Sequence, residues 1–328
     1  MKVLILGGTQ FVGAATTQEA LARGWQVTVF NRGTRPAPAG ATALAGDRLG
    51  DLSALTTGTW DLVVDTWKGA PRAVRESARL LAGRAGHYTY VSSRSVYAQP
   101  APSGGDESGP LVEGASPDAG DVPYPQAKLG GELAVAESFG DRALFARAGL
   151  ILGPYENVGR LPWWLDRISR GGAVPAPGPA DLPLQYLDCR DLARFLLDNP
   201  ATGGAFDLIS PPGHTTTREL LEACAKATGS SPDLRWLSPE QVEAAGVEPW
   251  SDLPIWLPPG ELHDTMHQGN PAKALAHGLT CRPVAETASD TWAWMHSSGW
   301  TAPDVVFGRR VGLAPAQEKV LLAQLGGA

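Results

Sequence analysis

Cysteine is scarce in this sequence. The three cysteines, Cys189, Cys224 and Cys281, lie far apart and do not form the paired spacing of a metal site. A secreted domain held together by disulfides would need more of them. We therefore expect no bound metal, a reducing environment and a cytoplasmic protein.

Long apolar runs and an excess of positive charge are also missing. No stretch approaches the roughly 18 apolar residues that cross a bilayer, and the opening MKVLILGG reaches glycine too early for a signal sequence. The 328 residues include 27 Lys and Arg against 34 Asp and Glu, a net charge of -7. A basic surface for nucleic acid is therefore not expected. We predict a small-molecule substrate, no nucleic-acid partner, no membrane contact and a possible homodimer.

Apolar runs alternate with helical patterns along the first two thirds of the chain. Helical spacing covers residues 11–22, 70–84 and 126–138. This alternation predicts an α/β fold, a Rossmann-type doubly wound parallel sheet covered on both faces. The predicted strands are residues 2–6, 26–30, 61–65, 87–92, 143–152 and 205–209.

The pattern changes after about residue 155. We assign residues 1–154 and about 183–212 to a dinucleotide-binding domain. We assign about 155–182 and 213–328 to a smaller, mostly helical substrate-binding domain. Within it, 162–182 reads as a short helix followed by a Pro/Gly-rich loop, and 314–325 reads as a C-terminal helix.

A glycine-rich turn follows the first predicted strand. Glycine lets the backbone approach a pyrophosphate, and the N-terminus of the next helix attracts negative charge. The alternative is a tight turn with only a structural role. The expected cofactor contacts in this turn are Gly7, Thr9, Gln10, Phe11, Val12 and Gly13.

The end of the second predicted strand favours NADP over NAD. A strand in this place commonly offers an acid to the adenosine ribose, but here Asn31 and Arg32 follow Phe30. Asn31 carries no charge to repel a 2′-phosphate, and Arg32 can donate to one. Alternatively, Arg32 stacks on the adenine or faces solvent. Asp47 could hold the adenine amino group or cap a following helix.

Tyr124 and Lys128 have the spacing of a proton-transfer pair. Positions i and i+4 share one face of a helix. A lysine ammonium beside a phenol stabilises the phenolate and so lowers the pKa of the tyrosine. Ser93 stands just past the predicted strand 87–92, where its hydroxyl could hold a substrate oxygen.

Six short motifs carry a family resemblance. The chain resembles the extended or atypical short-chain dehydrogenases/reductases, the NAD-dependent epimerase/dehydratase family. The motifs are GGTQFVG at 7–13, GDR at 46–48, YVSSRSVYA at 90–98, YPQAK at 124–128, RAGLILGPY at 147–155 and LDCRDLA at 187–193.

The resemblance implies roles for the residues in these motifs. Tyr124 would be the proton donor and acceptor, and Lys128 would lower its pKa and bind the ribose. Ser93 would orient the substrate oxygen, with Ser95 as a secondary contact. Arg48, in the GDR motif, would be a further cofactor contact.

Departures from the family pattern narrow the function. Arg94 and Ser95 replace the Asp-Glu pair of the sugar-nucleotide dehydratases. Leu150 replaces an Asn of the epimerases, and Leu184 and Gln185 replace an Arg that grips the diphosphate. We therefore predict an NAD(P)-dependent carbonyl reductase or alcohol dehydrogenase for a small or apolar substrate. An epimerase or isomerase with tightly bound cofactor, and a non-catalytic RNA-binding or cofactor-sensing protein, are the alternatives.

Tryptophan is abundant, with eleven residues. Large aromatic side chains most often pack in cores and interfaces, but they also line apolar pockets. The candidates for a pocket wall are Trp67, Trp163, Trp164, Trp250 and Trp256.

Overall fold

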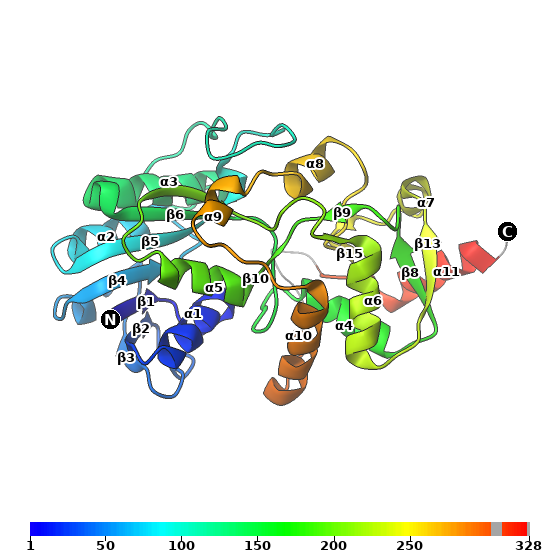
Figure 1. The fold of residues 1–328 in the computed structure, drawn as a ribbon, viewed down its shortest axis with the longest axis horizontal. Coiled ribbons are helices and arrows are strands. Elements are labelled where there is room, and N and C mark those ends of the chain that lie inside the picture. The colour runs from blue at the N-terminus through cyan, green and yellow to red at the C-terminus, as the bar shows by residue number, and fades with distance from the viewer. Residues whose placement is uncertain (303–309, 327–328) are drawn as a thin grey trace. The chain divides into compact units, whose positions relative to one another are not determined.

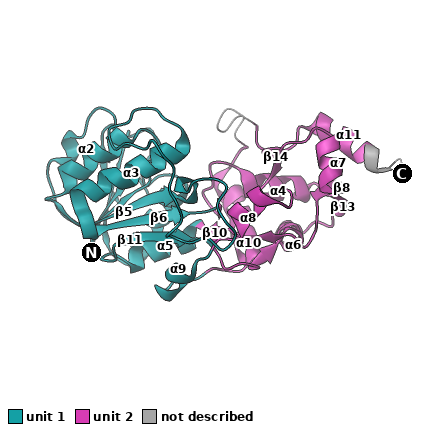
Figure 2. Cartoon of the chain, turned by 90° about the horizontal axis from the view of Figure 1, so that it is seen from above, with its two compact units in different colours: residues 1–149, 189–209, 270–280 teal, residues 150–188, 210–269, 281–328 magenta. Residues whose placement is uncertain are grey.

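The computed structural model describes residues 1–302 and 310–326, and the chain forms two compact units (Figure 2). Unit 1 contains Met1–Gly149, Cys189–Ile209 and Asn270–Thr280. Unit 2 contains Leu150–Asp188, Ser210–Gly269 and Cys281–Ala328. The units differ from the predicted domains at four places: 270–280 belong to unit 1, and 150–154, 183–188 and 210–212 belong to unit 2. The assignment of 303–309 and 327–328 lies outside the described residues.

Unit 1 is built on a seven-stranded parallel sheet (Figure 1). Most residues of its central strands are buried, because helices cover both faces. The strand order is β11-β6-β5-β4-β1-β2-β3 and reverses at β1, between β4 and β2. Doubly wound sheets bind ligands at the carboxyl ends of the strands where the order reverses. The strands are β1 (Lys2–Leu6), β2 (Gln26–Asn31), β3 (Thr42–Ala45), β4 (Trp60–Asp65), β5 (Ala85–Ser93), β6 (Ala143–Ala148) and β11 (Gly204–Leu208).

Helices cover the two faces of this sheet in pairs. On one face α1 packs against α5, and on the other α2 packs against α3 (Figure 1). Tyr88 and Tyr90 of β5 lie in the core beneath α2 and α3. The helices of unit 1 are α1 (Phe11–Ala22), α2 (Pro71–Leu81), α3 (Tyr124–Phe139), α5 (Cys189–Asp198) and α9 (Ala272–Ala276), with short turns η1 (Ser53–Leu55), η2 (Arg94–Val96) and η3 (Gly140–Arg142).

Unit 2 combines packed helices with short strand pairs. Helices α4, α6 and α10 pack against one another around an apolar core. A capping box of Thr216 and Glu219 starts α6, and Gly229 in a left-handed conformation ends it. The helices are α4 (Arg160–Ser169), α6 (Thr217–Thr228), α7 (Pro239–Ala244), α8 (Glu261–His267), α10 (Val284–Ser298) and α11 (Pro315–Gly326). The strands are β7 (Ile151–Leu152), β8 (Ala173–Pro177), β9 (Pro183–Leu184), β10 (Leu187–Asp188), β12 (Thr215–Thr216), β13 (Asp233–Leu237), β14 (Pro249–Trp250) and β15 (Leu253–Pro254).

The predicted fold class is confirmed, but one predicted strand is divided. The sequence predicts a strand over 143–152, whereas β6 ends at Ala148 and β7 pairs with β10 in unit 2. The break falls at Gly149, where an added Cβ would lie 2.5 Å from the side chain of Ile209. A side chain at position 149 would therefore clash with Ile209, and the prediction of one continuous strand is wrong beyond Ala148.

The sequence predicts a loop at 173–177, where the structure has the strand β8. Within the predicted loop, β8 pairs in parallel with β13. Pro175 and Pro177 cannot donate to a strand ladder, so the pattern there indicates a loop. A two-stranded sheet has only edge strands, however, and these tolerate proline.

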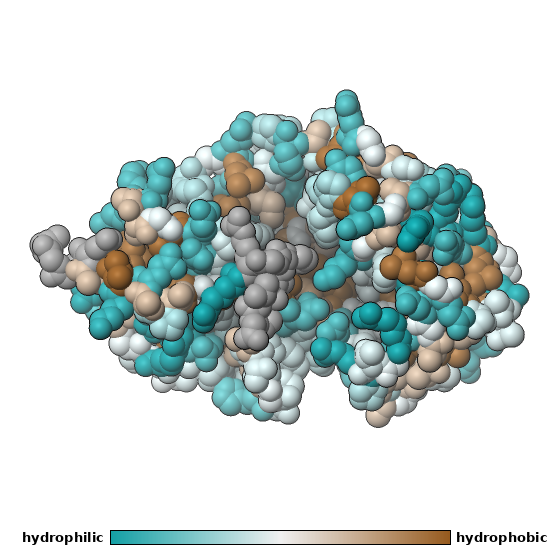
Figure 3. Space-filling model, turned by 180° about the vertical axis from the view of Figure 1, so that it is seen from behind, coloured by the Kyte–Doolittle hydropathy of each residue, from teal (hydrophilic) through white to brown (hydrophobic). Residues whose placement is uncertain are grey.

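The surface in Figure 3 is a mixture of polar residues and small apolar groups. None of the helices in the described residues is long and apolar enough to cross a membrane.

Candidate functional site

The glycine turn after β1 is shaped by close backbone packing. Gly7 and Gly8 have φ of +121° and +77°, a region that favours glycine. A Cβ on Gly13 would lie 2.6 Å from the backbone nitrogen of Gly8. The hydroxyl of Thr17 lies 2.9 Å from the Gly8 carbonyl oxygen and 2.8 Å from that of Gly13. The turn thus leaves the N-terminus of α1 free of side chains at these positions, as a pyrophosphate requires.

The other predicted residues of the turn differ in exposure. Val12 is buried, Thr9 and Phe11 are half-buried, and Gln10 is exposed. Gln10 precedes α1 in an extended conformation with φ of -141°, and its side chain forms no capping bond. The backbone there does not require glycine, so the glutamine is accommodated without strain. Contact of these residues with a cofactor stays a prediction.

Asn31 at the end of β2 has an unused hydrogen-bond donor. Its Oδ1 accepts a 2.7 Å hydrogen bond from the Gly33 backbone nitrogen. Its Nδ2 is buried and has no hydrogen-bond partner in the structure. Arg32 and Arg35 beside it are exposed. A buried amide donor next to two cations fits a ribose oxygen or a ribose phosphate.

Asp47 and Arg48, which follow β3, differ in exposure and in hydrogen-bond partners. Asp47 is exposed and its carboxylate accepts a 3.0 Å hydrogen bond from the Leu49 nitrogen, which forms a turn and not a helix cap. Arg48 is buried and donates two hydrogen bonds of 2.8 Å to Asp65 and one of 2.8 Å to Ser77. The guanidinium of Arg48 is therefore bound to protein groups, and the structure gives its predicted cofactor contact no side-chain support.

Lys128 is held in place by two backbone carbonyls. It is buried on α3, and its Nζ donates hydrogen bonds of 2.6 Å to the Trp67 carbonyl and 2.7 Å to the Val91 carbonyl. The Nζ also lies 5.9 Å from the ring centroid of Tyr124, which is exposed. Burial lowers the pKa of Lys128 to about 7, and the carboxylate of Asp65 opposes this shift. An ammonium has three donors, so one remains for a ligand.

Ser93 and Ser95 lie together where β5 ends. The Ser93 hydroxyl accepts a 3.2 Å hydrogen bond from the Ser95 nitrogen and lies 3.1 Å from the Ser95 hydroxyl. Both side chains are half-buried. The structure therefore brings two hydroxyls to one turn, and it holds Lys128 through Val91 of the same strand.

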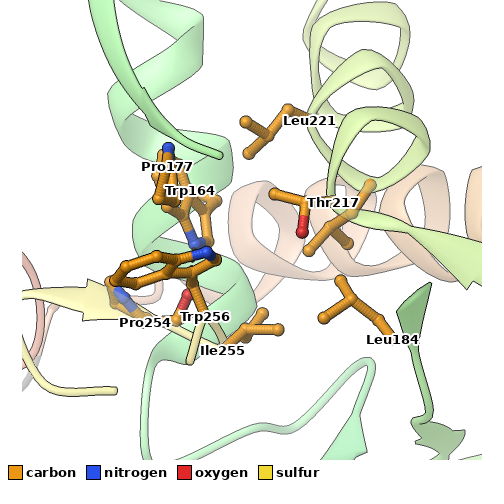
Figure 4. A pocket seen from close by; sticks show the side chains of 9 residues that line it. Trp164, Pro177, Leu184, Thr217, Leu221, Pro254, Ile255 and Trp256 are labelled. Carbon is orange, nitrogen blue, oxygen red and sulfur yellow. Dashed lines mark hydrogen bonds between the residues drawn. The ribbon is translucent and has the colours of Figure 1, made fainter. Parts of the chain in front are cut away.

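Most of the predicted pocket tryptophans are core residues. Trp163, Trp164 and Trp256 belong to the buried core of unit 2. Trp164 and Trp256 border a cavity of about 10 Å³, room for roughly one water molecule. Figure 4 shows their indole rings gathered with Ile255 around this space. Tight packing already uses the faces of these three residues, so the structure gives their role as a substrate wall no support, and that role stays a prediction. Trp250 is half-buried, with the Arg160 guanidinium 5.2 Å from its ring centroid.

Trp67 is the predicted tryptophan that reaches the site. Its indole nitrogen donates to the Ala70 carbonyl at 3.0 Å, and the Arg48 guanidinium lies 5.2 Å from its ring centroid. Its carbonyl accepts from Lys128, a role for the backbone that no side-chain pattern reveals. Asp65 was also missed, although an acid at the end of an apolar strand is a signal for a buried partner. The structure shows no group of metal-binding side chains among the described residues.

The chain is similar to one curated protein in sequence and to several solved structures in fold. No protein-family model matches the sequence. The chloroplast stem-loop binding protein of 41 kDa b from Arabidopsis thaliana is 25% identical over 270 residues, which cover 74% of this chain and 67% of the relative.

Two solved structures cover nearly the whole chain. The UDP-N-acetylglucosamine 4-epimerase of Bacillus cereus has a TM-score of 0.64 and 15% identity, and covers 90% of this chain and 99% of its own. The UDP-glucose 4-epimerase of Thermus thermophilus, solved with NAD, has a TM-score of 0.57 and 21% identity, and covers 91% of this chain and 100% of its own. With the strand order, these likenesses show that the chain shares the Rossmann-type fold of these epimerases.

Proposed function

We propose that this chain is an NAD(P)-dependent oxidoreductase that acts at a carbonyl or hydroxyl carbon of a small molecule. The observation that carries the proposal is the placement of Lys128. Two backbone carbonyls fix its ammonium within 5.9 Å of the Tyr124 ring centroid, and the glycine turn in the same unit fits a dinucleotide. A buried lysine costs stability, so its presence beside an exposed tyrosine points to a catalytic role.

Each residue of the site would have a separate role in proton transfer. Tyr124 would hold the proton that the substrate oxygen gains or loses, and its exposure leaves the phenol accessible. Lys128 in its charged form would stabilise the phenolate, and its third donor would bind the ribose. Ser93 and Ser95 would donate to the substrate oxygen. A nicotinamide bound at the carboxyl ends of the strands would supply or accept the hydride.

The cofactor would be NADP in preference to NAD. The unused Asn31 amide donor and the exposed Arg32 and Arg35 support a ribose 2′-phosphate. The Thermus thermophilus epimerase was solved with NAD, so both cofactors belong in the test. Arg32→Ala should weaken NADPH binding by roughly 10-fold or more and leave NADH binding within about threefold, since one charged contact contributes about 1.5–3 kcal/mol.

The substrate would not be a sugar nucleotide. Leu184 and Gln185 stand where the family places a diphosphate-binding arginine, and both are buried in unit 2. Gln185 uses its amide for hydrogen bonds of 2.8 Å to Ser210 and 2.7–2.9 Å to Gly269. Neither side chain offers a cation to the diphosphate, which would be costly to desolvate alone.

The test combines cofactor binding with a substrate panel. NADPH and NADH are titrated by fluorescence, and consumption of the preferred one is followed with aldehydes, ketones and UDP-sugars. Tyr124→Phe should lower turnover by roughly 100- to 10,000-fold with little change in cofactor affinity. Lys128→Met should lower both. Binding of neither cofactor by the wild type, or near-normal turnover in Tyr124→Phe, would contradict the proposal.

An epimerase is the second candidate, because the similar solved structures named above are epimerases. The same proton-transfer residues would serve it. An epimerase keeps its cofactor through the cycle, so it would convert a substrate without added nicotinamide. Product formation with purified protein alone would favour this candidate.

RNA binding is the third candidate, because the Arabidopsis relative is named a stem-loop binding protein. The net charge of -7 weighs against it. Salt-sensitive binding of an RNA stem-loop that is unchanged in Tyr124→Phe and Lys128→Met would favour it. The absence of a membrane partner, the cytoplasmic location and the homodimer stay predictions.

A further inference from the structure

A buried network of charged side chains lies in unit 1 beside the candidate catalytic residues. Arg147 donates to Glu132 at 3.0 and 2.7 Å and to the hydroxyl of Tyr97 at 3.1 Å. That hydroxyl donates to Asp207 at 2.6 Å, and Arg94 donates to Asp207 at 3.1 Å. All five side chains are buried, and together we call them the Tyr97 network.

The network joins the two segments that carry the candidate catalytic residues. Tyr97 ends the turn that begins at Ser93. Glu132 lies on α3 four residues after Lys128, which is about one helical turn. Ser92 reinforces this link because its hydroxyl donates to Glu132 at 2.6 Å. The serine-bearing turn and the helix of Lys128 are thus tied together through buried groups.

The loop that leads to Tyr124 is tied to the same network. The carboxylate of Glu107 accepts a 2.7 Å hydrogen bond from the Asp207 nitrogen, and its carbonyl lies 3.5 Å from an Arg147 nitrogen. Residues 99–123 contain no helix or strand, and Glu107 is one of several points at which hydrogen bonds hold this loop.

The cost of burying these charges argues against a role in stability alone. Replacing a buried ion pair by apolar residues is often neutral or stabilising. Burial raises the pKa of Asp207 to about 6 in spite of Arg94, which reflects the expense of ionising it there. Buried charged groups that are fully hydrogen-bonded hold the segments that carry them in one defined position.

We propose that Tyr97 is a positioning residue that couples two buried ion pairs and thereby fixes the Ser93 turn against the helix of Lys128. This inference rests on the proposed function, because the position that it fixes is that of the serine hydroxyls relative to Tyr124. Displacement of a reacting group by about 1 Å can cost roughly 100-fold in rate.

The test compares two buried tyrosines in one unit. Tyr97→Phe removes the hydroxyl that joins Arg147 to Asp207. The matched control is Tyr88→Phe, because Tyr88 also donates a 2.6 Å hydrogen bond to a buried aspartate, Asp65, that is paired with an arginine. Hydrogen exchange of the peptide covering 93–97 and denaturant unfolding are measured on the full chain for both variants.

We expect Tyr97→Phe to speed exchange in this peptide by about 10-fold or more, and Tyr88→Phe to change it by less than about threefold at similar loss of global stability. Equal effects of the two variants, or no effect of Tyr97→Phe, would overturn the proposal. If Tyr97→Phe does not fold, Arg147→Lys takes its place. Its ammonium can stay paired with Glu132 but cannot keep the two-pronged geometry that also reaches Tyr97; normal exchange in that variant would equally overturn the proposal.

Hydrogen exchange also separates this inference from the proposed function. It needs no substrate, so a chain without turnover can still confirm or overturn the coupling. Where turnover is found, Tyr97→Phe should lower kcat by roughly 10- to 100-fold and keep the dinucleotide affinity within about threefold, because it changes position and not binding.

Discussion

Replacing Arg48 by methionine distinguishes a structural ion pair from a cofactor contact. The structure gives Arg48 two hydrogen bonds to Asp65, one to Ser77 and one of 3.2 Å to the Ala73 carbonyl. Arg48→Met would leave the Asp65 carboxylate fully buried with only neutral donors. Removing one partner of a buried pair costs about 3–5 kcal/mol, so we expect about 4 kcal/mol less stability with no dinucleotide present.

The assay is urea denaturation followed by far-UV circular dichroism. The control is Arg23→Met, which removes partly exposed ion pairs to Glu19 and Asp198 and should cost less than about 1 kcal/mol. Adding Asp65→Asn to Arg48→Met should recover roughly 1–3 kcal/mol relative to the sum of the single changes, because no buried charge then lacks a partner. If Arg48→Met costs no more than Arg23→Met and instead weakens dinucleotide binding, the structural interpretation is refuted.

Three further outcomes follow from the geometry. Gly13→Ala should weaken dinucleotide binding and cost about 1–3 kcal/mol of stability, because its Cβ meets the Gly8 backbone; normal titration and unfolding curves would contradict this. Burial and the Arg142 guanidinium lower the pKa of His87 to about 4, below its usual 6.5. Stability from this group is therefore complete above pH 6.5 and lost as the pH falls from 6.5 through 4, and His87→Gln should flatten the pH dependence of unfolding over that window. Arg35→Ala should weaken NADPH binding more than NADH binding, and equal effects in titration would argue that Arg35 lies away from the phosphate.

The large sheet could be predicted because its strands follow a simple rule. A parallel strand covered on both faces is a short apolar run, and KVLIL at 2–6 shows this pattern directly. The short strands of unit 2 do not follow that rule. They contain only two to five residues, and prolines interrupt β8, so their pairing depends on tertiary contacts.

The sequence predicted the side chains of the candidate site but not the backbone groups that hold them. The i, i+4 spacing places Tyr124 and Lys128 on one helix face, but the groups that hold Lys128 are the carbonyls of Trp67 and Val91. Every residue has a carbonyl, so a sequence cannot indicate which ones a lysine will use. The network around Tyr97 likewise joins residues as far apart as Arg94 and Asp207, which no local pattern connects.

The route of the chain between the two units has a consequence for how the protein is made. The first 149 residues contain six strands of the large sheet, but β11 and α5 lie at 189–209 and α9 lies at 272–276. When only the N-terminal segment has left the ribosome, β6 of the nascent chain is therefore an unpaired edge strand, and α1 has no α5 to pack against. Exposed edges invite pairing with other chains, so the nascent protein has a period of risk that lasts until residue 208 has emerged. For the same reason unit 1 cannot be isolated by a single cut of the chain.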